Sequence, residues 1–85
     1  MILHVTRAVV IGPTHLEVEF SNGVSKQIDV SELFRGPVFE PLKDPVYFRQ
    51  VKLDPICRTV VWPNGADFAP EALLSLANRE MASLP

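Results

Sequence analysis

The residues best suited to metal binding are few and lie far apart. His4 and His15 are the only histidines, and Cys57 is the only cysteine. If residues 2–20 form a hairpin that turns at residues 12–14, His4 lies at one end of it and His15 at the other. A zinc site in a protein needs three or four His, Cys or carboxylate ligands at one point. We therefore expect no metal site.

Nucleophilic and acid–base chemistry finds no complete set of residues either. Cys57 lies in a loop beside Arg58, whose positive charge would lower the pKa of the thiol, but no histidine is expected nearby to act as a base. Glu17 and Glu19 are successive outward positions on one strand, about 7 Å apart, as on any solvated strand face. Glycine-rich phosphate-binding loops are absent. The sequence therefore predicts a protein that is not an enzyme and has no cofactor.

The densest group of distinctive residues is TVVWPNGADFAPEALL, residues 59–74. Trp62 ends a strand, Asn64-Gly65 supplies a turn with positive φ, and Asp67 suits the start of a helix. Architecture explains most of this corner, but an aromatic residue beside a polar turn is also a common interface anchor. If Trp62 is exposed, we expect the corner to be a contact surface. Our candidate protein-contact residues are Trp62, Asn64, Asp67 and Tyr47.

Size and charge limit the functional classes that fit. A chain of 85 residues that is 47% hydrophobic forms one domain, residues 1–85, with one core. The formal charge is −2, and residues 35–58 carry five basic against three acidic side chains. Nucleic-acid binding by the chain alone is not expected, because counterion release needs many clustered cations. Such binding would require the five basic side chains of this central segment to lie on one face. They are Arg35, Lys43, Arg49, Lys52 and Arg58.

The single cysteine and the shortness of the apolar runs indicate the cellular compartment of the protein. An intrachain disulfide is impossible, which fits a reducing environment. The start of the chain lacks the pattern of a signal peptide, and no apolar run approaches the roughly 20 residues of a membrane helix. We expect a soluble, cytoplasmic protein with no membrane partner.

One hairpin can be predicted together with its register. Residues 15–20 alternate with apolar side chains at even positions, and residues 24–30 keep the same parity. A two-residue Asn-Gly loop would place each apolar residue opposite a polar one, because a slip of one residue reverses the faces. A three-residue loop, Ser21-Asn22-Gly23, instead pairs Phe20 with Val24. We therefore predict the three-residue loop.

This register fixes several neighbours. Gly23 takes the left-handed position of a type I turn with a glycine bulge, and His15 lies opposite Asp29 on the outer face. Lys26 falls beside Val18 on the core side, where we expect its stem to pack on the core and its amine to reach water.

The remaining segments predict short elements. Residues 2–11 are rich in β-branched residues and predict a strand, but neither parity is cleanly apolar, which leaves open a bulge or burial on both faces. Residues 50–53 and 58–62 predict two further strands. The first and last strands leave a homodimer through an open sheet edge as an alternative to a monomer.

Prolines divide the middle of the chain. Pro37, Pro41 and Pro45 recur every fourth residue, so no long helix can pass through. We expect single helical turns capped by Ser31 and Asp44. A C-terminal helix opens at Pro70, with an apolar side formed by Leu73, Leu74, Leu76, Ala77 and Met81. The prediction is an α+β fold, with an antiparallel sheet of about five strands and the C-terminal helix packed on one face.

The order of these segments resembles a small bacterial family catalogued as domain of unknown function 2442. The resemblance covers about residues 5–74 and is carried by VEFSNGVSKQIDVSELF, GPVFEPLKDPVYFRQVKLD and TVVWPNGADFAPEAL. Relatives tend to have Ser where this chain has Ala69, just before Pro70. The missing cap should cost about 1 kcal/mol, unless another group such as the Asp67 carboxylate takes its place.

The resemblance also implies functions. It implies a small α+β fold without an assigned enzymatic activity, and genes of this family often lie beside another small gene, as in toxin–antitoxin pairs. We therefore expect a non-enzymatic protein-interaction module that binds a small partner protein, the partner-binding half of such a pair. The alternative is a regulatory component of a DNA-binding complex, since some relatives carry a helix-turn-helix, which we do not expect in this chain.

Overall fold

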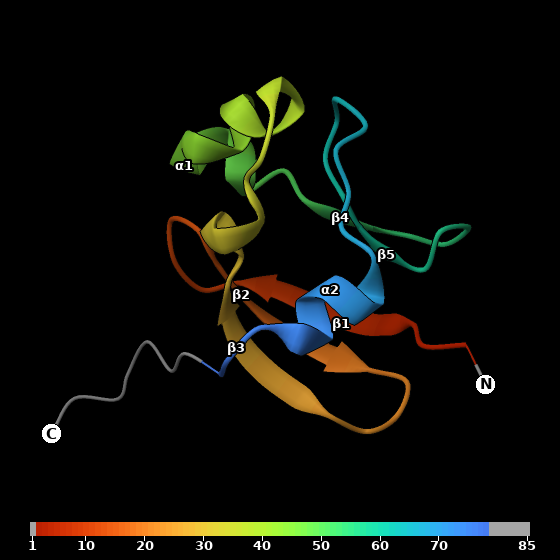
Figure 1. Ribbon diagram of the computed structural model, residues 1–85. Helices are drawn as coiled ribbons and strands as arrows, with labels where there is room; N and C mark the ends of the chain where they lie inside the picture. Colours follow the sequence, from red (N-terminus) through yellow and green to blue (C-terminus); the bar gives the residue numbers. More distant parts are fainter. Residues whose placement is uncertain (1, 79–85) are drawn as a thin grey trace, which may run out of the picture.

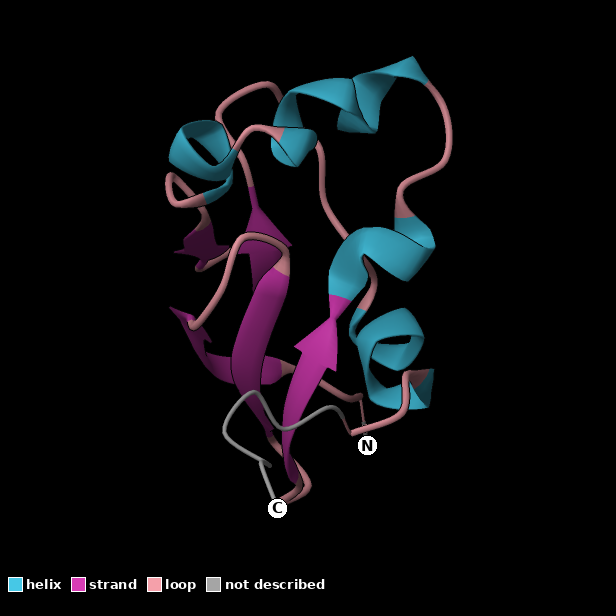
Figure 2. Cartoon of the chain, turned by 90° about the vertical axis from the view of Figure 1, so that its left-hand side faces the viewer, coloured by secondary structure: helices cyan, strands magenta, loops and turns pink. Residues whose placement is uncertain are grey.

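A computed structural model of the protein describes residues 2–78, which form a small α+β fold of antiparallel strands and short helices (Figure 1). The elements in chain order are β1 (Val5–Val10), β2 (His15–Phe20), β3 (Ser25–Asp29), the 3₁₀ helices η1 (Val30–Leu33) and η2 (Pro37–Lys43), α1 (Pro45–Phe48), β4 (Lys52–Asp54), β5 (Thr59–Val61) and α2 (Pro70–Ser75). In Figure 2 the helices lie along the top and one side of the strands.

The strands form two sheets, and the expected single sheet of about five strands is corrected. β1, β2 and β3 pair in that order, and β4 pairs with β5 in a separate two-stranded sheet. Where the sheets meet, the backbone N–H of Val5 donates to the carbonyl of Arg58 at 2.9 Å. The register of β1 shifts between Val5 and Arg7, and a bulge of this kind bends a strand and interrupts its pairing. The bulge was one of the two alternatives left open for this strand.

The β2–β3 hairpin has the predicted register. Leu16 pairs with Ile28, and His15 lies opposite Asp29. The N–H of Phe20 donates to the carbonyl of Val24 at 2.9 Å, which closes the three-residue loop. Gly23 has φ +88°, the left-handed conformation that a glycine adopts without steric cost. The alternation of apolar residues was therefore sufficient to choose the loop length.

Lys26 corrects one detail of that hairpin. Its amine does not simply reach water. It donates to the carbonyl of Leu76 at 2.6 Å and to the carbonyl of Leu74. The last carbonyls of a helix have no partner within the helix and carry partial negative charge. Lys26 therefore connects β3 to the end of α2 through hydrogen bonds.

The short helices follow the predicted capping pattern with one change. Asp44 caps α1, accepting the N–H of Val46 at 3.0 Å. η1 is capped by Asp29 and not by Ser31, because the Asp29 carboxylate accepts the Ser31 N–H at 3.0 Å. The Ser31 hydroxyl donates to the same carboxylate oxygen at 2.7 Å. The helix consequently begins at Val30.

The C-terminal helix is short. It ends at Ser75, so Leu76 and Ala77 follow it, and Met81 lies outside the described residues. No side-chain hydrogen bond caps its start, so Asp67 does not replace the missing serine. Leu73 is fully buried in the core. Packing of the helix on one face of a sheet stays a prediction.

One hydrophobic core connects both sheets and the helices. Its fully buried members come from seven elements and are Leu16, Val18, Ile28, Val30, Leu42, Phe48, Val60 and Leu73. Phe34 and Phe39 are partly buried and stack with the core residue Phe68, with Phe39 and Phe68 ring centroids 5.1 Å apart. Aromatic stacking thus attaches the helical connection that the prolines divide to the segment between β5 and α2.

Candidate functional site

Trp62 is a core residue and does not meet the condition set for a contact surface. Only 2% of it is exposed. Its indole Nε1–H donates to the carbonyl of Phe48 at 2.9 Å, and its ring meets Phe68 edge to face at 5.5 Å. A buried indole needs such an acceptor. Trp62 therefore joins β5 to α1 inside the protein, and the surface role expected for it is withdrawn.

Asn64 also has a structural explanation. Its Oδ1 accepts the N–H of Ala66 at 3.1 Å within the turn. Its Nδ2 donates to the carbonyl of Val38 at 2.8 Å, which attaches the turn to η2. Both ends of the amide are occupied, so the polar turn is explained by the architecture.

The turn at residues 62–66 repeats the turn at residues 20–24. In both, the N–H of the aromatic residue donates to the carbonyl four residues later, and the N–H of the glycine donates back to the aromatic residue's carbonyl. Gly23 and Gly65 have the same φ of +88°. The signal was present in the sequence, since FSNGV and WPNGA share an aromatic residue, Asn-Gly and an apolar residue.

The other two candidate contact residues lie at different places. Asp67 is exposed and follows the turn of Trp62 and Asn64, where its backbone pairs with Val61. Tyr47 is half-buried in α1 and packs against the core. The structure therefore places Trp62 and Asn64 in one turn, Asp67 directly after it and Tyr47 in α1.

The histidines are separated as predicted. His4 precedes the bulged start of β1, whereas His15 begins β2 opposite Asp29. Residues 2–78 contain no group of three His, Cys, Asp or Glu side chains that could hold a metal ion. The Nδ1 atom of His15 is buried and has no hydrogen-bond partner within the described part of the chain.

Cys57 differs from the expectation. It is exposed, but hydrogen bonding and the charge of Asp54 raise the pKa of its thiol, which Arg58 was expected to lower. Asp54 also accepts the backbone N–H of Cys57 at 2.6 Å. A neighbouring carboxylate disfavours the thiolate, so this thiol has no sign of activation.

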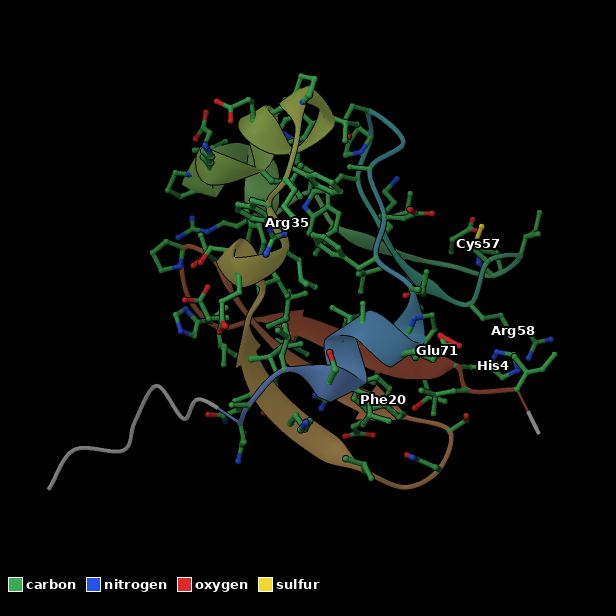
Figure 3. All side chains as sticks on the ribbon, in the orientation of Figure 1. His4, Phe20, Arg35, Cys57, Arg58 and Glu71 are labelled. Carbon is green, nitrogen blue, oxygen red and sulfur yellow. The ribbon has the colours of Figure 1, made fainter. Side chains whose placement is uncertain are left out.

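The central cations come from different elements, with Lys43 in η2, Arg49 at the end of α1 and Lys52 in β4. Lys43 pairs with Glu40 at 2.7 Å, and Arg35 and Arg58 lie in different parts of the view in Figure 3. The alternative role in a DNA-binding complex gains no support from this distribution and stays a prediction.

A groove that the sequence did not reveal lies between the two sheets. One wall comes from the start of β1 and the turn after β2, and the other from β4 and the loop that follows it. We call it the hairpin groove and define it by His4, Val5, Thr6, Ser21, Leu53, Asp54, Pro55 and Arg58. Its volume is about 470 Å³, and its walls are mainly apolar.

Exposed apolar side chains lie on β4 and on the loop that follows it, where Ile56 comes directly after the groove residue Pro55. Ile56 is 87% exposed, and Leu53 is 40% exposed. Arg58 is the one residue other than glycine with positive φ among residues 2–78, at +57°. It closes the loop, donating its N–H to the carbonyl of Asp54 at 2.8 Å. The sequence signal was Ile56 itself, an apolar residue in a loop beside proline, without a strand partner.

Comparison with known proteins identifies the family of this chain. No curated protein and no solved structure matches the chain. Among the described helices, none has the length and apolar character to cross a bilayer. Residues 5–79 match the family described as "Protein of unknown function (DUF2442)". Because the match extends over most of the 85 residues, the chain belongs to the DUF2442 family.

Proposed function

We propose that this chain is a non-enzymatic protein-interaction module that binds a small partner protein at the hairpin groove. One observation carries the proposal: Ile56 is 87% exposed beside a mainly apolar groove of about 470 Å³. Exposed apolar patches with polar rims mark protein-interaction sites. The partner we propose is the product of a neighbouring small gene, so that the chain is the partner-binding half of a toxin–antitoxin-like pair.

The charged and polar groups support binding more than catalysis. Asp54 is engaged by the loop's own Cys57 N–H at 2.6 Å, and the hydroxyl of Ser21 accepts the N–H of His4 at 2.9 Å. These groups shape the groove walls. A catalytic site would need a nucleophile and a base within hydrogen-bond reach, and the Cys57 thiol, whose pKa is raised, does not supply the first.

The test is capture of the partner from a lysate of the native host, followed by reconstitution. Tagged wild type, Ile56→Ser and Val46→Ser are compared. Val46 is a matched control, because it is 68% exposed on α1. We expect one protein to be held by the wild type and by Val46→Ser and lost by Ile56→Ser, and the purified protein to bind with the same dependence in calorimetry.

Two results would contradict the proposal. Equal capture by Ile56→Ser would place the partner on another surface, and no reconstituted binding would remove the partner altogether. Sedimentation equilibrium of the wild type and Ile56→Ser separates a further possibility. A dimer that depends on Ile56 would mean that the occupant of the groove is a second copy of the chain.

A further inference from the structure

We propose that Arg58 makes the hairpin groove selective for a partner segment in which an apolar side chain is accompanied by a carboxylate. The inference rests on the proposed function, because it names the chemistry of the partner at the same groove.

The walls favour an apolar side chain. Val5 lines one side, and Leu53 and Pro55 line the other. A volume of about 470 Å³ lies within the range of ligand-binding pockets. An apolar side chain seated here is removed from water together with the wall residues it covers, which provides the main driving force for binding.

Arg58 supplies the positive charge. Arg58 belongs to neither of the ion pairs Arg7–Glu19 and Lys43–Glu40. Its side chain is exposed and lies on the same side of the molecule as His4 (Figure 3). An arginine offers a planar set of donors that matches a carboxylate in a two-point interaction. The groove is therefore complementary to an acid.

The acid in the groove wall is bound by its own loop and forms no ion pair with Arg58. Asp54 is the carboxylate among the lining residues, and one of its oxygens accepts the Cys57 N–H at 2.6 Å. This bond holds the Asp54 side chain against the loop. His4 is a further polar residue of the walls.

The backbone gives an independent reason to assign Arg58 a role. Its φ of +57° is a conformation that glycine adopts freely and other residues adopt at a cost. The turn by itself would thus favour glycine at position 58. An arginine here places a guanidinium at the groove, which glycine cannot do, and no bond within the described residues requires that side chain.

Peptide selection tests the inference directly. A phage-displayed library of random dodecapeptides is selected on the immobilised wild type, and the best binder is synthesised in its acid form and with the acid replaced by the matching amide. Affinities are measured for the wild type, Arg58→Gly and Arg35→Ala. Arg58→Gly suits the local backbone and Arg35→Ala controls for general charge, since Arg35 is an exposed cation elsewhere.

We expect selected peptides to carry an aliphatic or aromatic residue within two positions of Asp or Glu. The acid peptide should bind the wild type and Arg35→Ala about tenfold more tightly than its amide form, a difference of one ion pair. On Arg58→Gly the two forms should bind alike.

Three results would overturn the inference: equal binding of acid and amide by the wild type, the same acid preference in Arg58→Gly, or no selected peptide that perturbs the amide resonances of His4 and Leu53. Any of them leaves the proposed function standing if capture of the partner still depends on Ile56. Failure of that capture, with the acid preference intact, would instead remove the proposed function.

Discussion

The side-chain Nδ2 of Asn64 donates a hydrogen bond of 2.8 Å to the carbonyl of Val38, 26 residues earlier in the chain. The bond joins the turn after β5 to η2, so it links the two-stranded sheet to the helical connection that crosses the protein. The same side chain closes its own turn through the N–H of Ala66. A single amide thus stabilises a turn and fixes its position.

Substitution of the two equivalent asparagines should separate these contributions. Asn22 makes the local bond, to the N–H of Val24 at 3.1 Å, in a turn of the same geometry. We expect Asn64→Ala to lower the free energy of unfolding by about 1 kcal/mol more than Asn22→Ala, the value of one further hydrogen bond. Urea denaturation measures both. Equal losses would mean that the bond to Val38 contributes nothing to stability.

Local periodicity predicted the parts of the fold that depend on neighbouring residues. The β2–β3 register followed from alternating apolar residues, and the caps and prolines predicted short helices around Pro37 and Pro45. The second Asn-Gly turn was recognised as a turn only, because Pro63 obscured its likeness to the turn at residues 21–23.

The candidate site could not be predicted in the same way. The hairpin groove exists because the start of β1 lies beside the loop between β4 and β5, about fifty residues later in the chain. That placement depends on the bulge in β1 and on the bond from Val5 to Arg58. The buried indole of Trp62 donates to a carbonyl of α1, and the residues around Trp62 in the sequence do not predict this contact.

Trp62→Phe should affect stability and leave partner binding unchanged. The change removes the donor to the Phe48 carbonyl and leaves a small cavity, so we expect a loss of about 2 kcal/mol in the free energy of unfolding. Thermal unfolding measures the loss, and capture of the partner at a temperature where the variant is folded measures binding. Loss of the partner from folded Trp62→Phe would return the contact surface to the corner.

Acid should destabilise the protein through Asp29. Burial raises the pKa of this carboxyl, but hydrogen bonds from Ser31 and Thr14 outweigh it and hold the pKa below its ordinary value. A group whose pKa is lowered on folding contributes stability above its unfolded pKa, near 3.9, and loses that contribution as the pH falls through the folded value. The free energy of unfolding should therefore fall with pH below about 4.

Asp29→Asn identifies the contribution of this residue. The variant should be less stable than the wild type near neutral pH, and its stability should depend less on pH in the acid range. Urea denaturation at a series of pH values gives both curves. Parallel curves for the two proteins would assign the acid sensitivity to other carboxyls.

The reactivity of Cys57 should be controlled by Asp54. Hydrogen bonding and charge from Asp54 raise the pKa of the thiol, so its alkylation by iodoacetamide at mildly alkaline pH should be slower than that of an unhindered thiol. Asp54→Asn should shift the pH–rate profile towards lower pH. A profile that does not move would show that Asp54 has no influence on the thiolate.

Arg58→Gly should make the protein more stable. At the positive φ of +57°, glycine avoids a steric cost of about 1–2 kcal/mol. Part of this gain is lost, because glycine also gives the unfolded chain more conformational freedom. We expect a net gain of about 0.5–1 kcal/mol, measured by urea denaturation.

Gly65→Ala is the matched test in the opposite direction. A Cβ at Gly65 would meet no atom within 4 Å, so the cost arises from its φ of +88° alone, and we expect a loss of about 1 kcal/mol or more. If both variants behave as expected, the arginine at position 58 lowers the stability of the protein. A residue that is retained although it lowers stability is typical of a binding site. Destabilisation by Arg58→Gly would instead mean that the side chain supports the fold, and the case for Arg58 as a carboxylate-binding residue would lose its backbone argument.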